Sequence, residues 1–250
     1  MEKNTLIIYG RNAVTEAVKN DENINSVCIQ KAAKGFGELI SLCKSKGIVV
    51  KEVTAERLVA MCLSGEKIGD SQAGIRHGGV AAVLSPVTYL SQDELLLAAK
   101  QESALILVLD GIEDPHNLGA LIRTAEAAGV TALVIPKRRG AAVTGAVYAA
   151  SAGAAAYVKI ARVTNTVAVL KQLKEQGLWV YGAEADGTPY SDIRRSSGER
   201  SVLVIGSEGQ GLSRLVRENC DYIVSIPMRG KINSLNASVS GGILMYALSI

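Results

Sequence analysis

The stretch VLVIGSEGQGLS, at residues 202–213, decides the fold class of this 250-residue chain. Four apolar residues run directly into a loop that contains Gly206, Gly209 and Gly211, and a helix-like segment follows at residues 212–218. An uninterrupted apolar run is typical of a parallel strand, since such a strand is covered on both faces. The stretch therefore predicts a buried strand, a glycine-rich loop and a helix.

The same alternation extends from residue 104 to residue 250 and predicts an α/β domain. An open, mostly parallel sheet with helices on both faces follows from such a pattern. Ligands in these sheets bind beyond the carboxyl ends of the strands. We expect strands at residues 105–110, 132–135, 156–160, 178–183, 202–206 and 222–226, and helices at residues 117–128, 142–152, 167–176, 212–218 and 234–249.

A second, smaller α/β unit is predicted before this domain. Strands are expected at residues 25–30, 48–53 and 80–85, and helices at residues 11–19, 34–46 and 55–63. Pro86 and a polar stretch then mark a linker that includes a helix at residues 92–101. We therefore expect a small domain at residues 1–85, a linker at residues 86–103 and a larger domain at residues 104–250.

Composition excludes several classes of protein. The chain is 48% apolar and 20% charged, which is enough to build a core, and only 4% aromatic, which argues against an RNA-recognition sheet of stacked rings. A net charge of +3 permits a nucleic-acid partner without demanding one. No apolar run of about 18 residues and no signal-peptide pattern are present, so we expect a cytoplasmic protein without a membrane partner. Four dispersed cysteines and two histidines predict reduced thiols and no metal site.

Two of the expected strand ends carry polar residues that could be functional. In DGIEDPHNLGALIRTAEAAG, residues 110–129, Asn117 stands at an expected N-cap and Arg123 lies inside an apolar helix. In the 202–213 stretch, Glu208 lies among glycines in the order G-x-x-G-x-G, which is neither the dinucleotide fingerprint nor a Walker A loop. A carboxylate there suits a neutral or cationic ligand. The plain alternatives are a capping Asn, a snorkelling Arg and a solvated Glu.

A third strand end lies within SIPMRGKINSLNASVSGG, residues 225–242. Ser234 is expected to be the N-cap of the last helix, without a capping box because Ala237 follows three residues later. Asn236 then lies in the first helical turn, where Asn has low helix propensity and needs a hydrogen-bond partner. The plain alternative is that Asn236 only fixes the loop.

In this order and spacing, the three segments resemble the SpoU (TrmH) class of the SPOUT superfamily, the S-adenosylmethionine-dependent RNA ribose 2′-O-methyltransferases. The matching stretches are residues 117–123, GSEGQGL at 206–212 and IPMRGKINSLNAS at 226–238. The one departure is Ala237, where many relatives carry Val. The first 85 residues, through YGRNAVTEAV at 9–18 and HGGVAAV at 77–83, look like the ribosomal-protein-type substrate-binding domain of bacterial members that methylate a guanosine of 23S ribosomal RNA.

This resemblance implies a C-terminal trefoil knot, a homodimer with its active site near the interface, and transfer of a methyl group from S-adenosylmethionine to a ribose 2′-hydroxyl of a guanosine in 23S ribosomal RNA. It implies that the methyl donor is bound by Gly206, Gly209, Ile226, Met228 and Leu235. The catalytic residues that it implies are Asn117, Arg123, Glu208, Ser234 and Asn236.

Two of these roles have more than one interpretation. Arg123 is either the base or a group that binds RNA phosphate and stabilises the developing alkoxide, because an arginine normally keeps its proton. Glu208 either offsets the sulfonium charge or fixes its loop. RNA contacts are expected from basic residues near strand ends and in loops, because such residues suit phosphates: Arg11, Lys137, Arg138, Arg139, Arg194, Arg195 and Arg200.

Three alternative functions stay open from the sequence. A nicotinamide-dependent oxidoreductase would share the sheet pattern, although the missing G-x-G-x-x-G counts against it. A transfer-RNA ribose 2′-O-methyltransferase would share the motifs. An RNA-binding ribosome-assembly factor with an inactive methylase domain would share the fold, and retention of the polar strand-end residues counts against it.

Overall fold

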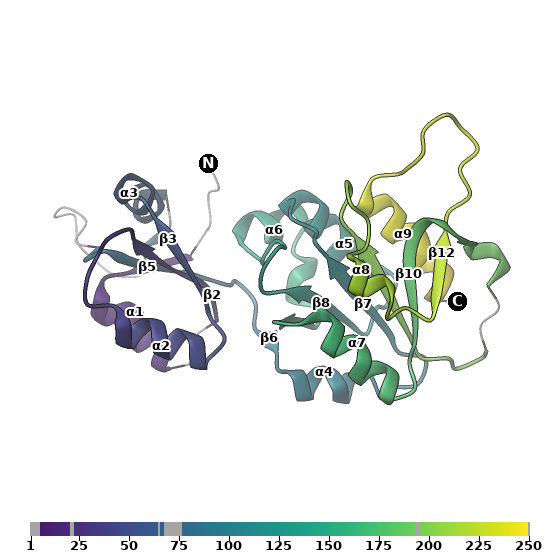
Figure 1. The fold of residues 1–250 in the computed structure, drawn as a ribbon, viewed down its shortest axis with the longest axis horizontal. Coiled ribbons are helices and arrows are strands. Elements are labelled where there is room, and N and C mark those ends of the chain that lie inside the picture. Colours follow the sequence, from purple (N-terminus) through teal and green to yellow (C-terminus); the bar gives the residue numbers. More distant parts are fainter. Residues whose placement is uncertain (1–5, 21–22, 65, 68–76, 194–195, 250) are drawn as a thin grey trace. The chain divides into compact units, whose positions relative to one another are not determined.

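The chain folds into two compact units in the computed structural model, which describes residues 6–20, 23–64, 66–67, 77–193 and 196–249 (Figure 1). One unit comprises Met1–Thr88 and Ala142–Tyr148, and the other comprises Tyr89–Ala141 and Ala149–Ile250. Within the described ranges, no helix is long and apolar enough to cross a membrane.

The first unit is a five-stranded mixed sheet with helices on both faces. Strand β5 lies in the middle of the order β3-β2-β5-β1-β4 and runs antiparallel to β1 and β2. Helices α1 and α2 pack on one face and α3 packs on the other. The elements are β1 (Leu6–Tyr9), α1 (Arg11–Lys19), β2 (Ile24–Gln30), α2 (Gly37–Ser45), β3 (Val49–Val53), α3 (Ala55–Ser64), β4 (Glu66–Lys67) and β5 (Val80–Leu84).

The second unit is built on a seven-stranded sheet in which every described pair of strands is parallel. The strand order is β12-β10-β11-β7-β8-β9-β6. Its strands are β6 (Tyr89–Leu90), β7 (Leu105–Asp110), β8 (Ala132–Pro136), β9 (Ile160–Val163), β10 (Trp179–Pro189), β11 (Ser201–Gly206) and β12 (Tyr222–Ser225). The helices that follow them are α4 (Gln92–Ala98), α5 (Pro115–Ala127), α7 (Thr166–Glu175), α8 (Arg214–Arg217) and α9 (Ala237–Ser249). Helix α6 (Gly145–Ala150) begins in the segment Ala142–Tyr148, which belongs to the first unit.

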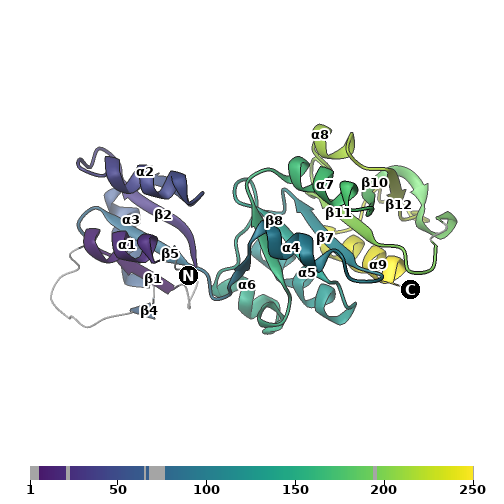
Figure 2. The same cartoon turned by 90° about the horizontal axis from the view of Figure 1, so that it is seen from below.

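Helices cover both faces of this sheet because its central strands are apolar on both sides (Figures 1 and 2). On one face, Val108 and Val204 share a buried cluster with Leu170 of α7 and with residues of α4 and α8. On the other face, α9 packs against both α5 and β11, where Gly241 lies close to Leu121 and Ile205. The predicted α/β class is confirmed.

Several boundaries differ from those predicted. The strand expected at residues 156–160 is wrong, since Gly153 has a φ of 84° and begins a short 3-10 turn, and β9 starts only at Ile160. Residues 89–103, expected to be part of a linker, contain β6 and α4 of the second unit, with β6 paired to β9. The trefoil knot stays a prediction, because strand order does not record which segment passes through which loop.

Two glycines inside helices of the second unit should respond oppositely to the same substitution. A Cβ on Gly119 of α5 would lie 2.5 Å from the Cβ of Ala150, whereas a Cβ on Gly242 of α9 would make an ordinary 3.5 Å contact with Thr124. We expect Gly119→Ala to lower the free energy of unfolding by about 1–3 kcal/mol through overpacking. Gly242→Ala should raise it by up to about 1 kcal/mol through helix propensity. Urea unfolding of both variants checks this, and a stabilised Gly119→Ala protein would contradict it.

Candidate active site

The polar strand ends meet where the strand order of the large sheet reverses. Strands β7 and β11 are neighbours, but the chain leaves β7 towards β8 on one side and reaches β11 from β10 on the other. A crevice forms beyond the carboxyl ends of parallel strands at such a reversal. The turn after β7 and the loop after β11 therefore lie next to each other.

The loop after β11 folds back tightly on the end of its own strand. Ser207 and Gly211 form a bridge in which the N–H of each residue donates to the carbonyl of the other, at 3.0 and 2.9 Å. A Cβ on Gly206 would collide with the backbone of Gly211 and Leu212. This close approach of the backbone therefore requires glycine at position 206.

Carboxylates from both neighbouring strands hold the far end of this loop. The N–H of Leu212 donates to Glu184 Oε1 at 2.6 Å, and the N–H of Ser213 donates to Asp110 Oδ2 at 2.7 Å. Glu184 follows Ala183 near the middle of β10, and Asp110 ends β7. The loop is therefore fixed from the strands on either side of β11.

Glu208 joins the three predicted segments through a network of side chains. Its Oε1 accepts hydrogen bonds from Asn117 Nδ2 and from Asn236 Nδ2, both at 2.7 Å. The amide of Asn236 also lies 3.0 Å from Asn117 Oδ1. The structure thus brings Asn117, Glu208 and Asn236 together, with Glu208 as the acceptor that they share.

The helix caps in this network differ from those predicted. Helix α5 begins at Pro115, a favoured first helical residue, and its N-cap is Asp114, which accepts hydrogen bonds from the N–H groups of His116 and Asn117. Asn117 is therefore not the cap. Helix α9 begins at Ala237, and Asn236 Oδ1 accepts from the N–H groups of Ser238 and Val239. The expected cap at Ser234 is wrong, since Asn236 makes the capping contacts.

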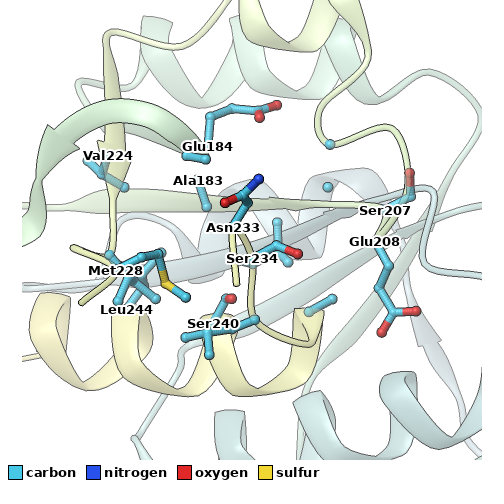
Figure 3. A pocket seen from close by; sticks show the side chains of 17 residues that line it. Ala183, Glu184, Ser207, Glu208, Val224, Met228, Asn233, Ser234, Ser240 and Leu244 are labelled. Atoms are coloured by element: carbon cyan, nitrogen blue, oxygen red, sulfur yellow. The ribbon is translucent and has the colours of Figure 1, made fainter. Parts of the chain in front are cut away.

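A cavity of about 200 Å3 opens beside this loop (Figure 3). Glu184 and Ser240 lie on opposite sides of Asn233 and Ser234, and Glu208 is turned away from Glu184. The side chains around the cavity are apolar or hydroxyl-bearing apart from two carboxylates and one amide. The residues that line it are Ala183, Glu184, Ala185, Ile205, Gly206, Ser207, Glu208, Gly211, Val224, Ile226, Met228, Asn233, Ser234, Leu235, Ala237, Ser240 and Leu244.

Four of the five residues expected to bind the donor line this cavity, and Gly209 does not. Gly209 lies instead on a larger cleft of about 1090 Å3 on the other side of the loop. The cavity and the cleft share Ser207, Glu208 and Gly211, so the loop separates them. The charged residues that line the cleft are three arginines, Arg138, Arg139 and Arg214, and four carboxylates, Asp110, Glu113, Asp114 and Glu208.

The residues expected to bind RNA lie in different surroundings. Arg139 is exposed in the cleft and has a φ of 56°, a strained backbone conformation for a residue with a side chain. Lys137 is half-buried and does not line the cleft; burial and the nearby Arg162 lower its pKa. In the first unit, exposed Arg11 lies 4.4 Å from the centre of the Phe36 ring.

Three further arginines were expected to contact RNA. Arg194 and Arg195 lie outside the described residues. Arg200 donates its guanidinium hydrogens to the carbonyls of Gln176 and Ala99 and thus ties together backbone segments.

Two of the five catalytic candidates lie outside this network: Ser234, which lines the cavity, and Arg123. The side chain of Arg123 is exposed, and it lines neither the cavity nor the cleft. Positions 117 and 123 differ by roughly 120° around a helix axis, so the two side chains leave α5 in different directions. Arg123 could contact Glu208 of the same chain only if its side chain left α5 in a different direction.

Glu184 is the functional candidate that sequence reasoning missed. It follows the predicted strand at residues 178–183, within YGAEADG, so its position at a strand end was a signal of the same kind as that of Glu208. Its contact with Leu212, however, depends on a long-range register that no local pattern contains.

Comparison with known proteins agrees with this geometry. A family model described as the SpoU rRNA Methylase family matches residues 104–246. The chain belongs to this family. A second model, described as RNA 2′-O ribose methyltransferase substrate binding, matches residues 7–90. The protein is thus an RNA methyltransferase of the SpoU/TrmH class.

Relatives extend the likeness over almost the whole chain. A Staphylococcus haemolyticus protein, which carries the name of a TrmH family tRNA/rRNA methyltransferase, is 41% identical over 96% of this chain and 94% of its own length. The structure of an AdoMet-bound rRNA methyltransferase from Sinorhizobium meliloti is similar in fold, with a TM-score of 0.60, 21% identity and coverage of 98% of this chain and 87% of that one. The A. aeolicus TrmH/SpoU tRNA modifying enzyme is 29% identical, with a TM-score of 0.53 over 63% of this chain and 80% of its own.

Substitutions of Asn236 should distinguish the effect of its hydrogen bond to Glu208 from the effect of its cap on α9. Asn236→Asp keeps an oxygen for the N–H groups of α9 but replaces the amide donor with a second carboxylate beside Glu208. We expect methyl transfer to RNA to fall by about 100-fold, since small misplacements of a site cost that much. Repulsion between the carboxylates should also make the variant less stable at pH 8 than at pH 6, where one of them gains a proton more readily.

Asn236→Ala is the comparison, because it removes the cap as well and should cost about 1 kcal/mol of stability without this pH dependence. Single-turnover methylation and urea unfolding at both pH values measure the effects. Wild-type turnover in Asn236→Asp would show that the amide donor is not needed.

Proposed function

We propose that this protein transfers a methyl group from S-adenosylmethionine to the ribose 2′-hydroxyl of a guanosine in 23S ribosomal RNA. The observation that carries the proposal is the loop at residues 207–211, which has on one side a cavity whose only charged lining residues are carboxylates and on the other side a cleft that contains three arginines among its charged residues. A cationic methyl donor suits the cavity, and the arginines of the cleft can contact the phosphates of an RNA acceptor. The reaction would take place in the cytoplasm.

The residues of the cavity fit S-adenosylmethionine. Gly206 lets the backbone of the loop approach closely, and Ile226, Leu235 and Met228 supply apolar surface. Glu184 and Glu208 are the charged side chains in the lining, which contains no cation. When bound, S-adenosylmethionine supplies an electrophilic methyl carbon, and the part of the protein is to hold and orient the reacting groups.

The acceptor would enter from the cleft. Arg138, Arg139 and Arg214 can contact phosphates there, and the strained backbone of Arg139 is consistent with a side chain retained for function. The side-chain oxygen of Asn236 accepts a hydrogen bond from α9, and its amide nitrogen donates one to Glu208. Asn236 therefore positions the network rather than the ribose. Ser234 has a hydroxyl on the donor cavity and is the better candidate for a contact with a substrate.

Arg123 would act in the site of a partner subunit. Its exposed position on α5, away from the cavity and the cleft of its own chain, suits a residue that completes a second copy of the site. The guanidinium would bind a phosphate near the ribose and stabilise the developing alkoxide. This supports a homodimer, as the resemblance implies.

Ribosomal RNA is favoured over transfer RNA by the family model matched at residues 104–246, which is described as the SpoU rRNA Methylase family. Transfer RNA is the second candidate, because the names of the relatives include both classes of RNA. An inactive assembly factor is disfavoured, since Asn117, Glu208 and Asn236 form a connected network rather than separate remnants. The oxidoreductase alternative is overturned by membership of the methyltransferase family.

Mapping of ribose methylation tests the proposal directly. Total ribosomal and transfer RNA from cells with and without the gene would be compared, and purified protein would be added back with labelled S-adenosylmethionine. We expect one guanosine of 23S ribosomal RNA to lose its 2′-O-methyl group and to regain it in the assay. Loss from a transfer RNA would support the second candidate, and base methylation would contradict ribose chemistry.

Mixed dimers test the placement of Arg123. Arg123→Ala and Glu208→Ala should each be inactive alone, with methylation reduced by about 100-fold or more. If Arg123 acts across the interface, a hybrid of the two variants contains one site with both intact residues and should regain up to half of the activity per dimer.

Co-expression with two affinity tags gives the hybrid, and single-turnover methylation measures it. A hybrid dimer as inactive as its parents would show that Arg123 acts on the network of its own chain. Wild-type activity in Arg123→Ala alone would show that Arg123 has no role.

A further inference from the structure

Strand β10 contains an excursion next to the donor cavity. It pairs with β12 through Ala183 and Val224, then leaves the ladder, and pairs again through Thr188 with the same Val224. A Cβ on Gly187 would lie 2.6 Å from the backbone of Ile223, so only glycine lets the chain return here. Ser225 Oγ donates a hydrogen bond to the Gly187 carbonyl at 2.8 Å and fastens the excursion. Such irregularities re-aim side chains beside active sites.

The excursion turns Glu184 towards the loop that lines the cavity. Glu184 is half-buried, its Oε1 accepts the N–H of Leu212 at 2.6 Å, and both carboxylate oxygens lie over Gly211. Gly211 has a φ of 64° and no side chain to keep the carboxylate out. One oxygen is thus committed to the backbone, which holds the charge of the group at a fixed place in the cavity wall.

No cationic side chain lies in the lining to neutralise this charge. Glu208, the other carboxylate, points away from Glu184 and accepts two amide hydrogen bonds. The nearby Arg217 holds Asp186 through two hydrogen bonds at 3.0 and 2.9 Å, and its pKa is raised mainly by Asp186 and less by the charge of Glu184. Glu184 is therefore a negative charge that is held in the wall of the cavity, where a ligand can contact it.

We propose that Glu184 is a specificity-determining residue that makes the cavity prefer the cationic sulfonium donor to its neutral thioether product. The proposal rests on the proposed use of S-adenosylmethionine. Donor and product differ by one methyl group and one unit of charge, so a carboxylate beside the cavity can distinguish them where apolar contacts cannot. A fixed carboxylate does so without the cost of ordering itself on binding.

Calorimetric binding of S-adenosylmethionine and S-adenosylhomocysteine to the full-length protein tests this. Glu184→Gln keeps an oxygen for the N–H of Leu212 but removes the charge. We expect the ratio of product Kd to donor Kd to fall by about threefold to tenfold relative to wild type, as expected for loss of one partly screened charge interaction. A role limited to holding the loop would weaken both ligands equally and would overturn the proposal.

Two further variants make the result interpretable. Glu175→Gln removes an exposed carboxylate that lines neither the cavity nor the cleft, so its ratio should equal that of wild type. Glu184→Asp keeps the charge and should keep the ratio even if both affinities fall, which provides the test should Glu184→Gln fail to fold. Thermal melting of the ligand-free proteins shows whether each variant still stabilises the loop at residues 207–211.

The outcomes separate this proposal from the proposed function. Wild-type protein that binds neither ligand would overturn both. Wild-type protein that binds both ligands, with the ratio unchanged in Glu184→Gln or lost in Glu184→Asp, would overturn the role of Glu184 alone.

Discussion

The carboxylate of Glu208 is the group on which the arrangement of the site depends. Its Oε1 accepts hydrogen bonds from Asn117 and Asn236, which lie 91 and 28 residues away in the sequence. Hydrogen bonds to a charged group contribute about 1.5–3 kcal/mol each, more than most neutral ones. A single side chain therefore ties the start of α5, the loop after β11 and the start of α9 to one point.

Each partner of Glu208 also lies at the start of a helix, so the position of Glu208 is linked to the positions of α5 and α9. Asn236 caps α9 with its oxygen, and this fixes where the long segment after β12 must end. Asn117 lies in the first turn of α5, whose start is set by Asp114 and Pro115. The parallel sheet makes this convergence possible, because the carboxyl ends of β7 and β11 lie side by side.

The sequence was informative where function depends on residues at the ends of apolar strands. Asn117, Glu208 and Asn236 could be chosen because polar residues follow buried strands or begin an apolar helix, and the fold class followed from the apolar runs. The caps could not be chosen, since Asp114 and Asn117 are both plausible N-caps until the helix start is known. Glu184 follows the end of a predicted strand in the same way as Glu208 and could have been chosen on that ground, but its contact with Leu212 could not be predicted, because it is a long-range contact that no local pattern encodes.

The two sides of the loop at residues 207–211 differ in charge in a way that suits methyl transfer. Carboxylates without a cation line the donor side, whereas the acceptor side holds three arginines together with carboxylates. A sulfonium loses its positive charge when its methyl group leaves, so an acidic wall favours the reactant over the product. The arginines of the cleft favour the RNA phosphates that bring the ribose to the loop. Cations present on one face of a short loop and missing from the other would thus help to orient both substrates before any bond changes, and Gly211, which lines both surfaces, keeps that loop thin.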